Sequence, residues 1–270
     1  MKKLILMTLL TLFTFTLSAQ DDRSYEAVTY LNGISVSEIP RFVELHKKFS
    51  NMAFDQNRLI TGDWLFRHWY GSGHTFVIYK QFNSMQDYHN DTDMVGQNII
   101  KSIQAIESEE ERDALMDEWA ELRAFYDGHT DEIRAAYPDT GFTTIENVNF
   151  DTAFVMSVGR YNSSGSWSDL GNAFYNWSIK PEIDQGVCIA GGVSYHFMGS
   201  GPEVEVWQCY NTLVDFATAV TSTDEMSEAS KDAMGTFWSL ADGGHEDQIY
   251  LHIGHMNLES GRFDLAGKDR

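Results

Sequence analysis

A histidine recurs at matching positions in the two halves of the sequence, and in the second half it has a candidate carboxylate partner. His68 and His196 each stand three residues before a Gly-Ser-Gly sequence. If Ser-Gly forms a two-residue hairpin turn, His196 lies directly opposite Glu205 on the next strand. A carboxylate beside an imidazole raises the imidazole pKa and fixes its tautomer, which suits a general base. The second half is the better catalytic candidate, because Val77 occupies the position of Glu205 in the first half.

Two His-x-Asp pairs also recur, at His129/Asp131 and at His245/Asp247. Each pair stands at the expected start of a strand, where residues two apart share a face and can contact each other. A local hydrogen-bonded pair is the favoured interpretation, and His245, Asp247 and His68 are retained as further catalytic candidates. The other histidines of the first half are expected at the surface: His46, His74 and His89.

The repeated residues belong to a longer internal repeat. Residues 68–88 align with residues 196–216 at a constant offset of 128 and without a gap. Six positions are identical: the histidine, the Gly-Ser-Gly, an asparagine and an aspartate. The glycines serve turn geometry, and the repeated Asn83 and Asn211 are expected to cap the helices that follow. The repeat predicts two copies of one structural unit.

Each half reads as strand, helix, hairpin, helix, strand. Strand-like runs open the halves at Ala27–Gly33 and Ala153–Tyr161, and helices begin near Ser35 and Ser166. This βαββαβ order is that of a ferredoxin-like unit, whose two helices cover one sheet face. We predict an α+β fold with ferredoxin-like units over residues 20–145 and 146–270. The two units bury their bare faces on each other, sheet to sheet, as a barrel within one chain.

Strand alternation predicts which side chains face the barrel interior. Trp64, Phe66 and Tyr79 share one face in the first half, and Trp207 shares the face of Glu205 in the second. These four aromatic residues are the predicted lining of a ligand-binding pocket. The opposite face of the second half is apolar and suits packing under helices: Val193, Tyr195, Phe197, Val204 and Val206.

The order of elements resembles that of the dimeric α/β-barrel superfamily, as a tandem duplication that covers nearly all of residues 20–270. This superfamily includes antibiotic-biosynthesis-type monooxygenases, chlorite-dismutase-like haem proteins and stress-responsive barrel proteins. The resemblance implies a barrel with a pocket and, from the monooxygenase-like members, a cofactor-free enzyme. It rests on topology, since no family-specific catalytic motif is present.

Residues 1–19 have the layout of a secretory signal peptide. Lys2 and Lys3 precede an apolar run from Leu4 to Leu17, and a small-residue cleavage site ends at Ala19. We expect an exported protein, periplasmic or secreted, with no integral membrane segment. Removal of the two lysines lowers the net charge from −21 to −23, because residues 1–19 contain no acidic residue. So acidic a chain repels phosphate backbones, which argues against nucleic-acid partners.

Three functions stay open at this point. The first is a monooxygenase-like or other small-molecule-processing enzyme in which His196 is the base and Glu205 orients it. The second is a non-catalytic ligand-binding or structural protein of the cell envelope. The third is a haem or metal protein, which the lack of a Cys-x-x-Cys-His or His-Glu-x-x-His motif disfavours. Whether the chain is an enzyme is undecided.

The partners follow from the same features. A small molecule is the expected ligand or substrate, no metal ligands are assigned, and the cofactor is unknown. A homo-oligomer is compatible with the sequence. Export permits a disulfide between Cys188 and Cys209, but geometry decides whether it forms.

Overall fold

The computed structural model describes residues 22–55, 57–71, 73–222 and 226–267. The predicted signal peptide lies outside these residues. Within them, no helix is both long and apolar enough to span a bilayer.

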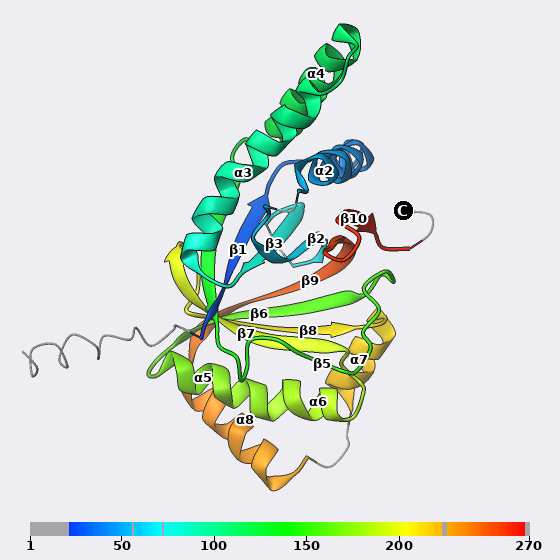
Figure 1. Ribbon diagram of the computed structural model, residues 1–270. Coiled ribbons are helices and arrows are strands. Elements are labelled where there is room, and N and C mark those ends of the chain that lie inside the picture. Colours follow the sequence, from blue (N-terminus) through cyan, green and yellow to red (C-terminus); the bar gives the residue numbers. More distant parts are fainter. Residues whose placement is uncertain (1–21, 56, 72, 223–225, 268–270) are drawn as a thin grey trace, which may run out of the picture.

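Each half of the described chain has the predicted order of elements (Figure 1). The first half contains β1 (Ser24–Leu31), α2 (Ile39–Ala53), β2 (Ile60–Tyr70), β3 (Phe76–Phe82), α3 (Met85–Gln104), α4 (Glu109–Phe125) and β4 (Thr130–Ala136). The second contains β6 (Val155–Ser163), α5 (Trp167–Phe174), a π-helical turn (Tyr175–Ile179), α6 (Lys180–Asp184), β7 (Ala190–Gly199), β8 (Val204–Tyr210), α7 (Leu213–Thr221), α8 (Glu228–Leu240) and β9 (Ala241–Asn257). Two short strands, β5 (Thr143–Thr144) and β10 (Arg262–Leu265), pair with β7 and β9.

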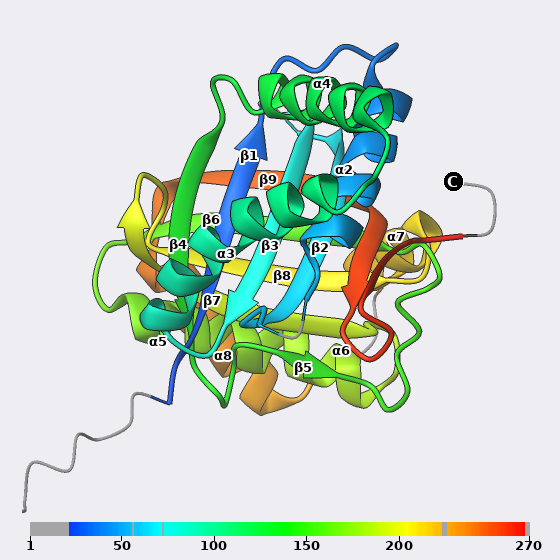
Figure 2. The same ribbon diagram turned by 45° about the horizontal axis from the view of Figure 1, so that its top comes forward.

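The strands close into an antiparallel barrel. The first half has the order β2-β3-β1-β4 and the second has β7-β8-β6-β9, each a ferredoxin-like order. β4 pairs with β7, and β9 pairs with β2, so each half covers the edge strands of the other. Helices α2, α3 and α4 lie outside the first half and α5 to α8 outside the second (Figures 1 and 2). The prediction of tandem ferredoxin-like units joined in one barrel is confirmed.

The offset of 128 residues is preserved in the structure. β3 and β8 correspond over their whole length, and α3 and α7 both begin at the offset position. The caps of these two helices are Ser84 and Thr212, whose hydroxyls accept hydrogen bonds from the backbone N–H groups of Asp87 and Asp215 at 3.0 and 3.1 Å. The prediction that the preceding asparagines cap the helices is therefore wrong by one residue. A Ser or Thr three residues before the Asp reaches that N–H directly.

The hairpin register differs from the prediction by two residues. Glu205 stands opposite Ser194, and the pairing of β7 with β8 runs on to His196, whose N–H donates to the Glu203 carbonyl at 2.8 Å. The turn is wider than two residues, and Gly199 adopts a φ of +94° at its start. His196 is thus not opposite Glu205, so the predicted pair is wrong. An even slip leaves every side chain on its predicted face.

The apolar side chains form separate cores on the two sides of the sheet. Phe66, Tyr79 and Trp207 are buried inside the barrel, with Trp64 packed against them, as predicted. The second-half residues predicted to pack under helices are found there: Val193, Tyr195, Val204 and Val206. Phe197 lies beyond this cluster and is 39% exposed. Cys188 belongs to the helix-side core and Cys209 to the barrel core, and both thiols are free.

Candidate functional site

The four predicted aromatic residues line one cavity of about 50 Å³ inside the barrel. Its other apolar walls are Phe142, Phe150, Phe154, Met156, Ala190 and Cys209. Phe142 lies between β4 and β5, where its ring stands 5.4 Å from that of Trp207 and 6.2 Å from that of Trp64. Because Phe142 is 41% exposed, it separates this aromatic cavity from solvent.

Glu26 is the carboxylic acid in the wall of the aromatic cavity. β1 buries alternate residues inside the barrel, which carries Glu26 inward with Val28 and Tyr30. Only 7% of Glu26 is exposed, and its Oε2 atom has no hydrogen-bond partner among the described residues. Burial, and next the charge of Glu205, raise its pKa to about 8, against the opposing effect of Arg134. A carboxyl in this state exchanges its proton near neutral pH.

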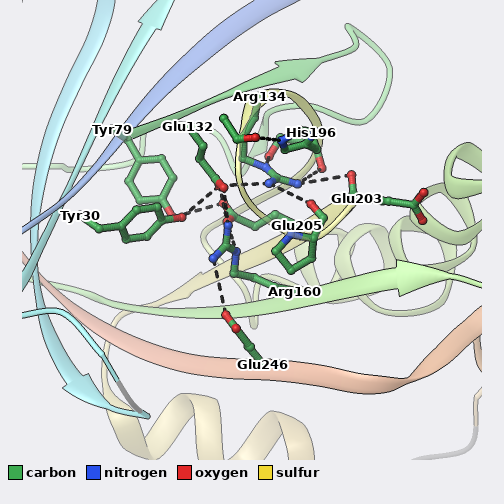
Figure 3. Close-up of polar contacts among 12 residues, drawn as sticks. Tyr30, Tyr79, Glu132, Arg134, Arg160, His196, Glu203, Glu205 and Glu246 are labelled. Atoms are coloured by element: carbon green, nitrogen blue, oxygen red, sulfur yellow. Dashed lines mark hydrogen bonds and ion pairs between the residues drawn. The ribbon is translucent and has the colours of Figure 1, made fainter. Parts of the chain in front are cut away.

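A buried ion network joins the two halves (Figure 3). Arg160 Nη2 donates to both oxygens of Glu132 at 2.6 and 2.7 Å, and Arg160 Nε lies 3.2 Å from Glu205 Oε2. Arg134 Nη1 donates to Glu132 at 3.0 Å, and Arg134 Nε donates to the Ser194 hydroxyl at 2.9 Å. Glu132, Arg134 and Glu205 are each at most 1% exposed. The guanidinium groups therefore serve to compensate buried carboxylates.

The charges of this network explain why one carboxyl keeps its proton. Three buried carboxyls, those of Glu26, Glu132 and Glu205, face two guanidiniums, those of Arg134 and Arg160. Two negative charges are compensated and the third is not, so its ionisation is disfavoured in this dry interior. Burial raises the pKa of Glu205 as well, and the two arginines oppose this effect. Glu205 Oε2 lies 3.2 Å from Arg160 Nε, whereas Glu26 Oε2 has no partner among the described residues, which makes Glu26 the natural holder of the proton.

Two tyrosines donate to the network from the first half. The Tyr30 hydroxyl donates to Glu132 at 3.1 Å, and the Tyr79 hydroxyl donates to Glu205 at 3.2 Å. Burial raises the pKa of both phenols well above the usual value. They remain neutral donors at physiological pH and hold the carboxylates in place.

The predicted catalytic histidines lie outside the aromatic cavity. His196 is half-buried, and its Nε2 hydrogen-bonds the Gly199 carbonyl at 3.1 Å, not Glu205. His68 is half-buried beside His74, with ring centroids 5.3 Å apart. The structure brings Glu205 alone of the predicted catalytic residues into the ion network.

The two His-x-Asp pairs form as local contacts. The Nε2–Oδ2 distances are 2.9 Å for His129/Asp131 and 3.0 Å for His245/Asp247. Both members of each pair are exposed, and His245 also stacks on a tyrosine of β6. The surface assignment is wrong for His46, which is 3% exposed because α2 directs it into the helix-side core. It is also wrong for His74, which is half-buried, whereas His89 is exposed.

Sequence reasoning missed Glu26, Glu132, Arg134 and Arg160. Each lies within a strand, where a charged side chain ordinarily faces solvent. The signal for Glu26 is its parity with Val28 and Tyr30 on the inward face of β1. The strand that the sequence predicts begins one residue later, at Ala27, and so does not include Glu26.

The site does not fit a haem. The volume of about 50 Å³ is less than two waters occupy in the liquid, and none of the described histidines lines the cavity. Among the described residues, no three His, Cys, Asp or Glu side chains are grouped so as to hold a metal ion. The chemistry of the site is therefore that of a carboxyl and an aromatic wall.

The fold is that of a dimeric α/β barrel, and the comparisons agree. An anthrone oxidase-like protein matches with a TM-score of 0.56 at 11% identity, over 88% of this chain and 94% of that one. A protein from Fusobacterium nucleatum, provisionally named a monooxygenase, matches with a TM-score of 0.56 at 9% identity, over 91% and 95%. A third protein, from Lactobacillus acidophilus and also provisionally named a monooxygenase, matches with a TM-score of 0.53 at 6% identity, over 90% of this chain and 97% of that one. No protein-family model and no curated protein matches the sequence.

Proposed function

We propose that the chain is a small-molecule-processing enzyme of monooxygenase-like kind, in which Glu26 removes a proton from a flat aromatic substrate held in the aromatic cavity. The observation that carries this proposal is the position of Glu26. Its carboxyl is buried in a mainly apolar wall, which Lys80 and Gln81 also line, and one of its oxygens is unpaired among the described residues. The pKa of about 8 leaves about a tenth of Glu26 ionised at pH 7, which is suitable for a general base.

The substrate class follows from the walls. The seven aromatic side chains that line the cavity favour a planar, apolar molecule. A C–H group flanked by aromatic rings or a carbonyl is a weak acid that a buried carboxylate can deprotonate. The names of the structural neighbours, anthrone oxidase-like and monooxygenase, indicate oxygen chemistry on such compounds, and an anthrone is a tricyclic aromatic ketone with such a CH₂ group.

The reaction balances with dioxygen as the co-substrate. The Glu26 carboxylate takes a proton from the CH₂ group, and the carbanion bonds to O₂, which it reduces to a peroxide anion. Glu26 returns the proton to the distal oxygen. Loss of the remaining C–H proton with cleavage of the O–O bond then forms the carbonyl and water. The carbon is oxidised by four electrons, and one O₂ yields one carbonyl oxygen and one H₂O.

The cavity must open for this substrate to enter. Its volume of about 50 Å³ is smaller than the ~150 Å³ of a cavity that binds benzene. Phe142 is the wall residue most free to move, since it is 41% exposed and belongs to a connecting segment. Rotation of Phe142 away from Trp207 admits the substrate, and its return excludes water.

The test is oxygen uptake by the purified chain with anthrone and substituted hydroquinones, in the presence of a chelator. We expect a product that has gained one oxygen and lost two hydrogens from anthrone. Glu26→Gln should lower kcat by about 100-fold or more while binding, followed by tryptophan fluorescence, is retained. Glu146→Gln is the control, since Glu146 is exposed.

Two outcomes contradict the proposal. Turnover by E26Q at the wild-type rate removes the role of Glu26. Binding of the aromatic compounds without any turnover by the wild-type chain favours the alternative, a non-catalytic ligand-binding protein.

We also propose export, on the signal-peptide layout of residues 1–19. N-terminal sequencing of the protein from the producing cell should begin at Gln20. A protein that begins at Met1 or Lys2 contradicts this proposal.

A further inference from the structure

A second cavity, of about 270 Å³, lies at the other end of the barrel. β1 carries Glu26 into the aromatic cavity and Tyr30 into this polar pocket. β6 likewise carries Met156 into the first and Arg160 into the second. The residues that line the polar pocket are Tyr30, Asn32, Gly73, His74, Thr130, Arg160, Ser200, Glu246, Gln248 and Tyr250. The buried ion network separates the two cavities.

The polar pocket contains buried polar atoms without partners. Tyr250 is 1% exposed and lines this pocket. The Nε2 atoms of His74 and of the adjacent His68 are buried and have no hydrogen-bond partner among the described residues. A buried imidazole nitrogen without a partner is unfavourable. These atoms require a molecule that both donates and accepts hydrogen bonds, as a hydroxyl group does.

The charges around the pocket favour a neutral molecule. The Arg160 guanidinium is compensated from inside by Glu132 and Glu205, and Glu246 at the rim lies 3.5 Å from it. An anion finds no uncompensated positive charge here, and the net charge of −21 repels it. A cation would lie against Arg160. The pocket therefore lacks the charge that would hold an ion of either sign.

The rings of the pocket supply a wall for stacking. The ring of His74 lies 4.8 Å from that of Tyr30 and 5.4 Å from that of Tyr250. Hydroxyl and amide groups surround this wall at Asn32 and Thr130. The volume is slightly below that of pockets for drug-sized ligands and suits one ring.

We propose that the polar pocket binds a small, neutral, polyhydroxylated molecule, such as a single sugar ring, with the Tyr250 hydroxyl as a direct contact. The rings of Tyr30, His74 and Tyr250 pack against its C–H face, and its hydroxyls pair with the buried donors and acceptors. This site is distinct from the aromatic cavity and does not depend on the chemistry of Glu26.

The experiment compares three molecules that share one ring: D-glucose, D-glucuronate and D-glucosamine. Saturation-transfer NMR and calorimetry on the purified chain measure their binding at pH 7. We expect glucose to bind with a Kd below about 20 mM, and the charged sugars to bind at least about tenfold more weakly. Tyr250→Phe, which keeps the ring and its packing, should weaken glucose binding by about five- to tenfold.

The controls separate this site from its surroundings. Tyr137→Phe changes a half-buried tyrosine packed against the helix-side core and should leave glucose binding unchanged. Glu26→Gln should also leave it unchanged. Absence of glucose binding, tighter binding of glucuronate, or equal affinity of Y250F and the wild type each overturns the proposal.

Discussion

Arg160 of the second half donates two hydrogen bonds to Glu132 of the first half, at 2.6 and 2.7 Å, in the centre of the barrel. Both side chains are almost fully buried. The two halves are thus joined by compensating charges as well as by the pairing of β4 with β7 and β2 with β9. The network therefore combines ion pairs within each half, Arg134–Glu132 and Arg160–Glu205, with the Arg160–Glu132 pair between the halves.

Removing Arg160 should therefore destabilise the whole barrel. In Arg160→Met, Glu132 and Glu205 retain only Arg134 as a counter-charge, and we expect a loss of about 3–5 kcal/mol of unfolding free energy in urea denaturation. Lys180→Met is the control, because the Lys180–Asp184 pair is exposed and contributes little to stability. Equal effects of the two substitutions contradict the role of the network.

The raised pKa of Glu26 predicts that the free energy of unfolding falls as pH rises. The carboxyl titrates near 4.5 in the unfolded chain and near 8 in the folded one. Between these values the folded state keeps a proton that the unfolded state has lost, so this residue lowers stability as pH rises. The unfolding free energy of Glu26→Gln, relative to that of the wild type, should therefore rise by about 3–5 kcal/mol between pH 4.5 and pH 8. Urea denaturation of both proteins across this pH range measures the change, with Glu146→Gln as the control. A difference in unfolding free energy between E26Q and the wild type that stays constant with pH contradicts the raised pKa of Glu26.

His252 predicts the opposite dependence at low pH. It is fully buried between Phe154 and Phe66, both ring nitrogens lack partners in the described chain, and burial lowers its pKa to about 3. The unfolded imidazole binds a proton below pH 6.5, so stability is lost as pH falls from 6.5 toward 3. At pH 4.5, His252→Leu should have lost about 2–3 kcal/mol less unfolding free energy than the wild type has lost.

Exposed His89 supplies the control for that measurement. His89→Gln should follow the wild-type stability curve from pH 7 to pH 4. If H252L and H89Q lose stability in parallel with the wild type, His252 is not the residue that titrates.

Phe142 should govern access to the aromatic cavity. Phe142→Ala removes the ring that covers Trp207, so association and dissociation of an aromatic ligand should both become faster in stopped-flow fluorescence. Unfolding free energy should fall by only about 1 kcal/mol, because the residue is 41% exposed. Met116→Ala, at the same 41% exposure on α4, is the matched control. Unchanged ligand kinetics in F142A contradict the gating role.

The fold could be predicted because its signals are local and repeated. Ser84 and Thr212, the turn glycines and the alternating strands recur at one offset, and alternation survives the two-residue register slip that displaced His196 from Glu205. The aromatic lining followed from the same alternation. The ion network could not be predicted in this way, since Glu132, Arg160 and Glu205 meet only when the barrel closes across its two halves. A charged residue in one strand gives no sign of a partner in another.

The most direct test of the account is the titration of Glu26 itself. The side-chain carboxyl ¹³C resonance of Glu26, assigned by its absence in E26Q, is followed by NMR from pH 4 to pH 10. The account predicts a midpoint at about 8, because burial beside Glu205 disfavours the carboxylate. A midpoint near 4.5, the ordinary value for glutamate, would contradict the assignment of Glu26 as the general base of the aromatic cavity.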